Sequence, residues 1–261
     1  MKYESITLEI QDGIALLVIN RPKQLNALNQ ATLTEFSAAI DELAANDSVR
    51  VVMITGSGDR AFVAGADIRE FEAIKHASDG TRLSQHAHAV FQKVVDLPKP
   101  VIAAINGFAL GGGLELALAC DIRLAADTAT LGLPEITLGI MPGWGGTTRL
   151  TRILGPGLTK LFVFGGERLS ATDAQAAGIV ERVYPAKDLM NEARALATRL
   201  AGLPPLALAA AKQSINRSHD MSLADANQHE SLLFGQLCVT EDAREGARAF
   251  VEKRPAVWKG R

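Results

Sequence analysis

Residues 1–10 alternate between charged and apolar positions, and two apolar segments on either side of a turn signal predict a β-hairpin over the first twenty residues. Ile6 to Ile10 and Ile14 to Asn20 look like two strands, the second of which is almost entirely apolar. Asp12-Gly13 lies between them and is a strong signal for a tight turn. Pro22 should end the second strand, because proline has no backbone N–H to donate to a neighbouring strand.

Farther along, short apolar runs alternate with segments of helical spacing, and this order predicts an α/β core. Val49 to Thr55 is a continuous apolar run, as expected of a strand that is buried on both faces. Leu33, Phe36 and Ile40 have the spacing of one face of a helix. Strands that alternate with helices favour a sheet of parallel strands. We expect further strands at 101–105 and 122–126, and helices at 28–43, 83–95 and 113–119.

From Pro142 onward the pattern is almost entirely helical. One short strand is expected at Ile179 to Tyr184, and Pro204-Pro205 marks a joint between two parts of the chain. The interpretation is an α/β core over residues 1–200 and a helical C-terminal region over residues 201–261. Beyond the joint we expect helices at 206–215, 223–237 and 241–253.

Composition and charge narrow the class of protein. The 261 residues include 27 basic and 29 acidic side chains, for a formal net charge of −2. A protein that binds nucleic acid or a membrane surface would carry a basic excess, so neither partner is expected. No apolar stretch is long enough to cross a membrane, and no secretion signal is visible, so we expect a cytoplasmic protein. Cys120 and Cys238 lie in apolar stretches and are interpreted as small core residues of a protein in a reducing compartment.

A glycine-rich turn follows the predicted strand at 49–55. Residues 56–61 (Gly-Ser-Gly-Asp-Arg-Ala) fit the G-x-G-x-x-A pattern of dinucleotide-binding proteins. That pattern needs a helix to begin here, so that its N-terminus can hold a pyrophosphate. Phe62 and Val63 follow instead and are poor residues for such a helix. We favour a polar turn, and a dinucleotide-dependent oxidoreductase remains an alternative.

Three consecutive glycines, Gly111 to Gly113, directly precede a short apolar segment that contains Glu115. Ordering consecutive glycines costs more chain entropy than ordering other residues, so their presence indicates that the backbone needs a shape that only glycine adopts easily. The helix is expected to start here, and the first N–H groups of a helix have no partner within it. Such a place suits an oxyanion. Glu115 lies in the first turn among apolar residues, so we expect its carboxylate to be buried.

A second glutamate, Glu135, follows Pro134, which is suited to the first position of a helix. Either glutamate alone could be a simple carboxylate at a helix start. The small residues from Ala61 to Ile68 would let a ligand approach the backbone, and Asp67 could cap a helix there. Both glutamates lie beside glycine-rich segments, and this favours a joint site over two unrelated helix starts.

Other catalytic motifs fail on spacing. His86 and His88 are two residues apart, so they face opposite sides of the predicted helix and cannot share a metal ion. The chain contains neither the G-x-S-x-G nucleophile motif nor the P-loop lysine motif. We therefore expect no metal site.

Together the glycine-rich and glutamate motifs resemble the enoyl-CoA hydratase/isomerase (crotonase) superfamily. The resemblance rests on residues 64–67, 106–115 and 134–135, and it extends from residues 20–29 to residues 250–254. It is closest to the true hydratases, including short-chain crotonases. It implies an α/β fold, a crotonase-type spiral of ββα units, with a helical C-terminal region that takes part in trimer formation, often as a dimer of trimers.

The resemblance also implies a reaction and roles for individual residues. The reaction would be reversible syn addition of water to a trans-2-enoyl-CoA, which gives a 3-hydroxyacyl-CoA. Glu115 and Glu135 would be the catalytic residues, and the N–H groups of Ala66 and Gly112 would form the oxyanion hole. Coenzyme A would be part of the substrate, and no separate cofactor is expected. The positions at which the family contacts the acyl-CoA are here Ala27, Ala64, Ala66, Asp67, Ile68, Arg69, Gly112, Gly143 and Lys253.

Two residues depart from the commonest pattern of the superfamily. Leu114 stands where hydratases often have cysteine, and Trp144 stands where a smaller residue or phenylalanine is frequent, so Trp144 could narrow the acyl pocket. Isomerases commonly keep only the carboxylate at the Glu135 position, so both glutamates together favour hydration. Isomerisation, hydration of a branched or aromatic substrate, and a non-catalytic RNA-binding relative remain alternatives.

Overall fold

The computed structural model describes residues 3–261, and its main sheet has six strands in the order β1-β2-β3-β5-β7-β10. The first two strands form the predicted hairpin, in which Gln11 pairs with Ile14. Asp12 and Gly13 both have positive φ angles, 52° and 77°, as a two-residue hairpin turn requires. From β2 onward the neighbouring strands of this sheet are parallel. The strands are β1 (Ile6–Gln11), β2 (Ile14–Ile19), β3 (Val51–Gly56), β5 (Val101–Ile105), β7 (Ile122–Ala126) and β10 (Arg182–Tyr184).

A second sheet of four short strands lies in the order β4-β6-β8-β9. Each of three successive units gives its first strand to the main sheet and its second strand to this small sheet, and then continues into a helix. The structure therefore confirms the predicted α/β class with repeated ββα units. The short strands are β4 (Ala61–Val63), β6 (Phe108–Leu110), β8 (Thr130–Gly132) and β9 (Arg168–Ser170).

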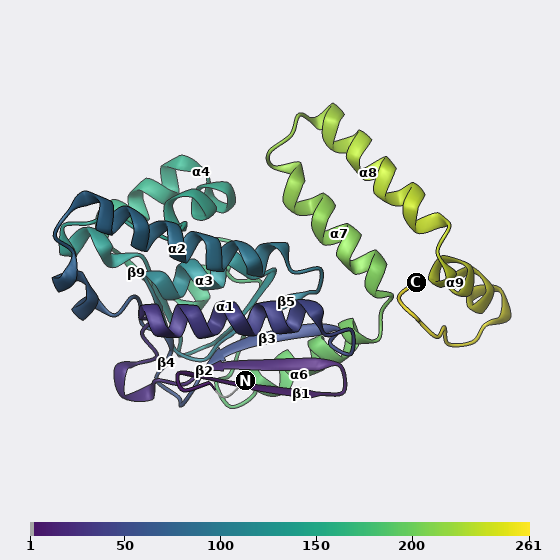
Figure 1. The fold of residues 1–261 in the computed structure, drawn as a ribbon, viewed down its shortest axis with the longest axis horizontal. Coiled ribbons are helices and arrows are strands. Elements are labelled where there is room, and N and C mark those ends of the chain that lie inside the picture. The colour runs from purple at the N-terminus through teal and green to yellow at the C-terminus, as the bar shows by residue number, and fades with distance from the viewer. Residues whose placement is uncertain (1–2) are drawn as a thin grey trace.

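Helices cover the main sheet. In Figure 1, α1 and α2 lie on one side of it, whereas α6 packs on it from the other side. The core strands β3 and β5 are buried along their whole length, as the continuous apolar runs predicted. The helices of this part are α1 (Gln30–Ala45), α2 (Ala77–Asp96), α3 (Gly112–Ala119), α4 (Gly146–Gly165), α5 (Ala171–Ala176) and α6 (Leu189–Ala201).

The last three helices extend away from the sheets, at the right of Figure 1. They are α7 (Pro205–Ser218), α8 (Leu223–Cys238) and α9 (Glu241–Glu252). Lys212 on α7 fixes this region to the core, because its Nζ atom donates to the carbonyl of Val94 at 3.1 Å and lies 2.9 Å from the carboxylate of Asp121. In the part of the chain that the structure describes, no helix is long and apolar enough to span a membrane.

Two expectations from the sequence were wrong in detail. The strand expected from Ile179 begins only at Arg182, because the N–H groups of Ile179 and Val180 donate to the carbonyl of Ala174 and so belong to the end of α5. Cys238 was expected in the core but lies exposed on α8, whereas Cys120 is buried as expected.

Candidate active site

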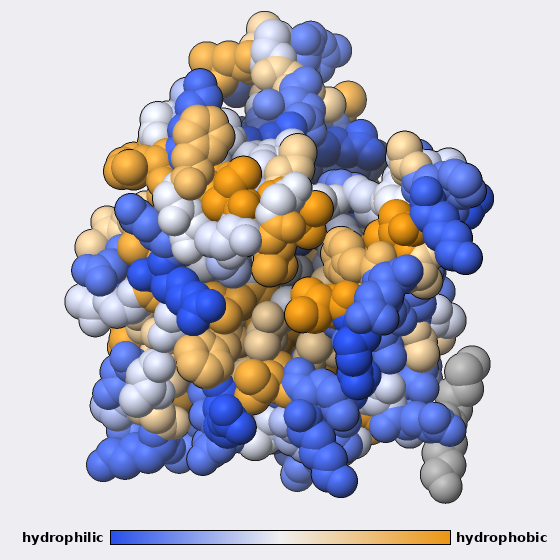
Figure 2. Space-filling model, turned by 90° about the vertical axis from the view of Figure 1, so that its left-hand side faces the viewer, coloured by the Kyte–Doolittle hydropathy of each residue, from blue (hydrophilic) through white to orange (hydrophobic). Residues whose placement is uncertain are grey.

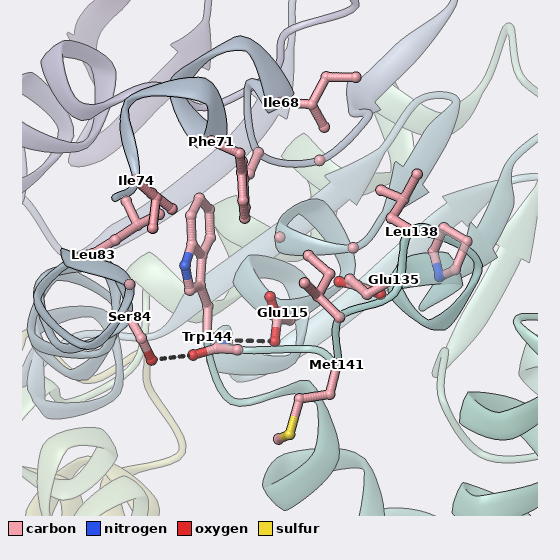
Figure 3. A pocket seen from close by; sticks show the side chains of 18 of the residues that line it. Ile68, Phe71, Ile74, Leu83, Ser84, Glu115, Glu135, Leu138, Met141 and Trp144 are labelled. Atoms are coloured by element: carbon pink, nitrogen blue, oxygen red, sulfur yellow. Dashed lines mark hydrogen bonds between the residues drawn. The ribbon is translucent and has the colours of Figure 1, made fainter. Parts of the chain in front are cut away.

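An apolar pocket of about 370 Å³ lies where the start of α3 meets the loops that follow the short strands. On the face shown in Figure 2, apolar side chains gather around a central hollow. The pocket wall comes from four parts of the chain, including two 3₁₀ helices, η2 (Ile68–Ala73) and η3 (Pro134–Leu138). The side chains of Glu115 and Glu135 are the charged groups among its lining residues (Figure 3).

Glu115 is buried, as the sequence predicted, with 2% of its surface exposed. It lies in the first turn of α3, and its Oε1 atom accepts hydrogen bonds from the N–H groups of Trp144 and Gly146, both at 2.8 Å. Oε2 accepts no hydrogen bond from the residues that the structure describes, 3–261. One carboxylate oxygen is therefore held by the protein, and the other is left for a water molecule or a substrate.

Burial raises the pKa of Glu115 from 4.5 to about 7. The N–H groups of Gly146 and Trp144 oppose this shift, and the nearby charge of Glu135 adds to it. A carboxyl group with a pKa near neutrality can both accept and release a proton under ordinary conditions.

Glu135 faces the same pocket from η3, where Pro134 occupies the first helical turn as predicted. Its Oε1 atom lies 2.8 Å from the position that a Cβ atom would take on Gly111, and the positive φ of Gly111, 49°, favours glycine there. Its Oε2 atom is buried and has no hydrogen-bond partner within residues 3–261. Burial also raises the pKa of Glu135. An unpartnered carboxyl oxygen in an apolar pocket is costly and indicates a chemical role.

Two backbone N–H groups without a backbone acceptor in the described part of the chain belong to residues that line the pocket together with these carboxyl groups. Among residues 3–261, neither the N–H group of Ala66 nor that of Gly112 has a backbone acceptor. A Cβ atom on Gly112 would lie 3.5 Å from the nitrogen of Ala66, so the two donors are close together. Gly112 is the first residue of α3, where N–H groups are free of helical bonds. The pair can stabilise negative charge on a carbonyl oxygen.

The loop that carries Ala66 is fixed on both sides of the donor. The N–H of Leu28 donates to the carbonyl of Gly65 at 2.8 Å, and the N–H of Asp67 donates back to the carbonyl of Leu28 at 2.8 Å. The carboxylate of Asp67 accepts hydrogen bonds from Arg69 and from Arg21. These arginines hold the pKa of Asp67 well below its usual range. These contacts of Asp67 hold the backbone of the loop that carries Ala66 in place.

The loop at residues 143–146, which holds Glu115, is itself fixed by two side chains that the sequence did not single out. The hydroxyl of Ser84 on α2 donates to the carbonyl of Gly143 at 2.5 Å. Nη1 of Arg149 on α4 donates to the carbonyl of Trp144 at 3.1 Å. Neither residue has a sequence signal, because only the packing of α2 and α4 against this loop brings them there.

We predict that Ser84→Ala lowers kcat by about 3- to 30-fold, because the loop that orients Glu115 loosens by a fraction of an ångström. Ser84→Thr keeps the hydroxyl and should retain most of the activity. Steady-state kinetics of both variants would test whether the Ser84 hydroxyl contributes to kcat, and thermal melts would check that both variants fold. Equal losses in the two variants would contradict a role for the hydroxyl.

We also predict that Glu115→Gln makes the protein more stable at neutral pH. The folded state of the wild type binds a proton on Glu115 more tightly than the unfolded state does, so its stability falls as the pH rises from about 4.5 through about 7. The glutamine can still accept both N–H bonds but cannot ionise. The unfolding free energy of Glu115→Gln should exceed that of the wild type by little near pH 4.5 and by about 2–3 kcal/mol above pH 7. Denaturant unfolding at both pH values measures this, and a difference independent of pH would contradict it.

The structure brings most of the residues predicted for the site into one place. Glu115, Glu135, Ala64, Ala66, Ile68, Gly112 and Gly143 all line the pocket. Ala27, Asp67 and Arg69 lie beside it and support its loops. Lys253 ends α9 and is exposed, away from the pocket lining. The described residues contain no group of side chains that could hold a metal ion.

Comparisons with known proteins agree with this geometry. The family model described as Enoyl-CoA hydratase/isomerase matches residues 9–261. A short-chain-enoyl-CoA hydratase from Clostridium acetobutylicum is 42% identical over 254 residues, which cover 97% of each chain. A crotonyl-CoA hydratase from Syntrophomonas wolfei is 41% identical over 256 residues, which cover 98% of each chain. A crystal structure of an enoyl-CoA hydratase from Bacillus anthracis has a TM-score of 0.95 and 39% identity, and the match covers 99% of this chain and 100% of that one.

Proposed function

The chain belongs to the enoyl-CoA hydratase/isomerase family, and from this premise we propose that its pocket adds water to 2-enoyl-CoA thioesters with Glu115 and Glu135 as base and acid. The enzyme is an enoyl-CoA hydratase, a hydro-lyase. The observation that carries the assignment of the site is the free Oε2 atom of Glu115, in the same pocket as Glu135 and the two backbone donors.

The reaction begins with activation of the thioester. A C=C bond conjugated to a thioester is a poor electrophile until negative charge on the carbonyl oxygen is stabilised. The N–H groups of Ala66 and Gly112 would donate to that oxygen as the enolate forms, which is worth several kcal/mol in a water-poor site. The loop contacts of Asp67 hold one donor, and the start of α3 holds the other.

Two proton transfers complete the addition. Ionised Glu115 takes a proton from water, the water oxygen bonds to Cβ, and the C=C electrons move onto the carbonyl oxygen. Protonated Glu135 then gives its proton to Cα, and the carbonyl re-forms. Burial raises the pKa of both carboxyl groups, that of Glu115 to about 7, and the proposed reaction starts from the state in which Glu115 is ionised and Glu135 holds the proton. Delivery of the water oxygen and the proton to the same face of the double bond would give syn addition.

Both carboxyl groups favour hydration over double-bond isomerisation. An isomerase moves a proton between two carbons, so a single carboxyl group is sufficient for it. Here a second buried carboxyl group, Glu115, is oriented by two N–H donors and keeps a free oxygen for water. The function is tested by incubating the protein with crotonyl-CoA and following the loss of the conjugated enoyl absorbance. Unchanged absorbance with enoyl-CoA of every chain length would overturn it.

We further propose that the enzyme works as a homotrimer or as a dimer of trimers. Large apolar side chains on α8 and α9 are exposed in the single chain, including Phe234 at 67% and Phe250 at 86%. Apolar patches of this kind favour contact with a second copy. In such an assembly Lys253 could reach the nucleotide of an acyl-CoA bound by a neighbouring subunit. Sedimentation should give a mass three or six times 27.7 kDa, and a monomer would contradict the proposal.

We propose that the reaction needs no cofactor besides the coenzyme A of its substrate, because carboxyl groups and backbone donors supply every proton transfer and the oxyanion stabilisation. A cytoplasmic location is also proposed. The unpaired Cys120 and Cys238 suit a reducing compartment.

A further inference from the structure

Trp144 follows Gly143 in the loop that holds Glu115, and its side chain is almost completely buried, with 5% exposed. Its ring packs edge-on against Phe91 of α2, with 6.0 Å between ring centroids and 77° between ring planes. The ring also rests on the start of α3, since a Cβ atom on Gly112 would lie 2.6 Å from Cζ3 of Trp144. The indole is therefore fixed between α2 and one oxyanion donor.

The indole ring of Trp144 lines the pocket beside Glu115. In Figure 3 it lies between Glu115 on one side and the apolar side chains of Ile74 and Leu83 on the other. In the proposed function, the thioester carbonyl binds at Gly112 and Cβ lies within reach of Glu115. An acyl chain that continues from Cβ toward Ile74 and Leu83 would meet the indole, which lies between them and Glu115.

The chemistry of the lining also selects the acyl group. Apart from the two carboxyl groups, the lining consists of apolar side chains, glycines and Ser84, and none of its residues is Lys, Arg or His. An acyl chain that ends in a carboxylate would lose its hydration there without gaining a cationic partner. The pocket therefore suits an uncharged acyl chain.

Building on the proposed function, we propose that the indole ring of Trp144 sets the length limit of the substrate, so that the enzyme prefers short, uncharged enoyl groups and discriminates against long ones. The ring can be removed without losing the contact that orients Glu115, because that contact comes from the backbone N–H of residue 144. Substitution of Trp144 should thus change the substrate range more than the chemistry.

The test compares kcat/KM for crotonyl-CoA, for 2-decenoyl-CoA and for an enoyl-CoA whose acyl chain ends in a carboxylate. The wild type should prefer crotonyl-CoA over 2-decenoyl-CoA by about tenfold or more, since even one methylene that does not fit an apolar pocket is worth about that factor. It should also prefer crotonyl-CoA over the substrate that ends in a carboxylate, because the lining offers that charge no cationic partner. In Trp144→Ala the ratio of decenoyl to crotonyl activity should rise by about tenfold or more. In Trp144→Phe, which keeps a smaller ring and is less disruptive to folding, the rise should be smaller.

Trp258→Ala is the matched control, because it removes the chain's other tryptophan, which packs on Gly246 of α9 outside the pocket lining. Its decenoyl-to-crotonyl ratio should equal that of the wild type. The length limit is overturned if the wild type accepts 2-decenoyl-CoA as well as crotonyl-CoA, or if both Trp144 variants keep the wild-type ratio. Failure of the proposed function is a different result, in which the wild type hydrates none of the three substrates.

Discussion

Replacing Glu115 with glutamine should lower kcat for hydration of crotonyl-CoA by about 100- to 10,000-fold, the usual worth of a general acid or base. Glutamine keeps the size of the side chain and can accept the N–H bonds of Trp144 and Gly146, so the pocket should keep its shape. It cannot take a proton from water. KM should change little, because in the proposed mechanism the N–H groups of Ala66 and Gly112, and not Glu115, hold the thioester.

Glu135→Gln should cause a loss of the same order, because the α-carbon then has no proton donor. Glu9→Gln, on an exposed position of β1, is the matched control and should leave kcat unchanged. Rates are compared at several pH values, with circular dichroism to confirm folding. Near-normal activity in either active-site variant would remove that residue from the mechanism. Glu115→Gln is also expected to be more stable at neutral pH, so its circular dichroism should be that of a folded protein.

Gly113→Ala should lower both the stability and the activity of the enzyme strongly. A Cβ atom on Gly113 would lie 1.9 Å from the carbonyl oxygen of Val63, which is backbone of β4 and cannot rotate away. The substitution must therefore push α3 away from β4, which leads into the loop with Ala66. We expect a loss of about 3 kcal/mol in unfolding free energy. A shift of about 1 Å between Ala66 and Gly112, the two proposed oxyanion donors, should cost about 100-fold in kcat.

Gly157→Ala is the control for this substitution. Gly157 lies in α4, and a Cβ atom there would meet nothing within 4 Å, so alanine should be neutral or slightly stabilising. Denaturant titration and steady-state kinetics of both variants test the prediction. A Gly113→Ala enzyme with the stability and rate of the wild type would show that α3 and β4 approach less closely than the structure indicates.

Most of the main sheet could be predicted from the sequence because its strands, apart from the three-residue β10, carry long signals. The apolar runs predicted β3 and β5 because strands buried on both faces need apolar residues at every position. Asp12-Gly13 predicted the turn because both residues tolerate the positive φ angles that it requires. The small sheet could not be predicted, because strands of three residues such as β4 and β6 are too short to show a period. Helix α2 begins at Ala77, six residues before the predicted start, because its first turns are polar and carry no apolar stripe.

The candidate site was predicted unevenly for a similar reason. Glu115 and Glu135 were found because a carboxylate among apolar residues is unusual within the local sequence. Ser84 and Arg149 were missed, since their contacts to the loop that holds Glu115 exist only after α2 and α4 have packed. Trp144 was singled out as a departure from the family pattern, but its position over Gly112 and beside Phe91 required the structure.

Hydration of crotonyl-CoA in deuterated water tests the central claim most directly, because it reports water addition and the placement of both proton-transfer groups together. The account predicts a 3-hydroxybutyryl-CoA that carries one deuterium at Cα, as the single diastereomer of syn addition, by mass spectrometry and by proton coupling constants. A product with no added water, or one with deuterium on the opposite face or on both faces, would contradict the assignment of Glu115 and Glu135 as a pair that acts from one side of the bound substrate.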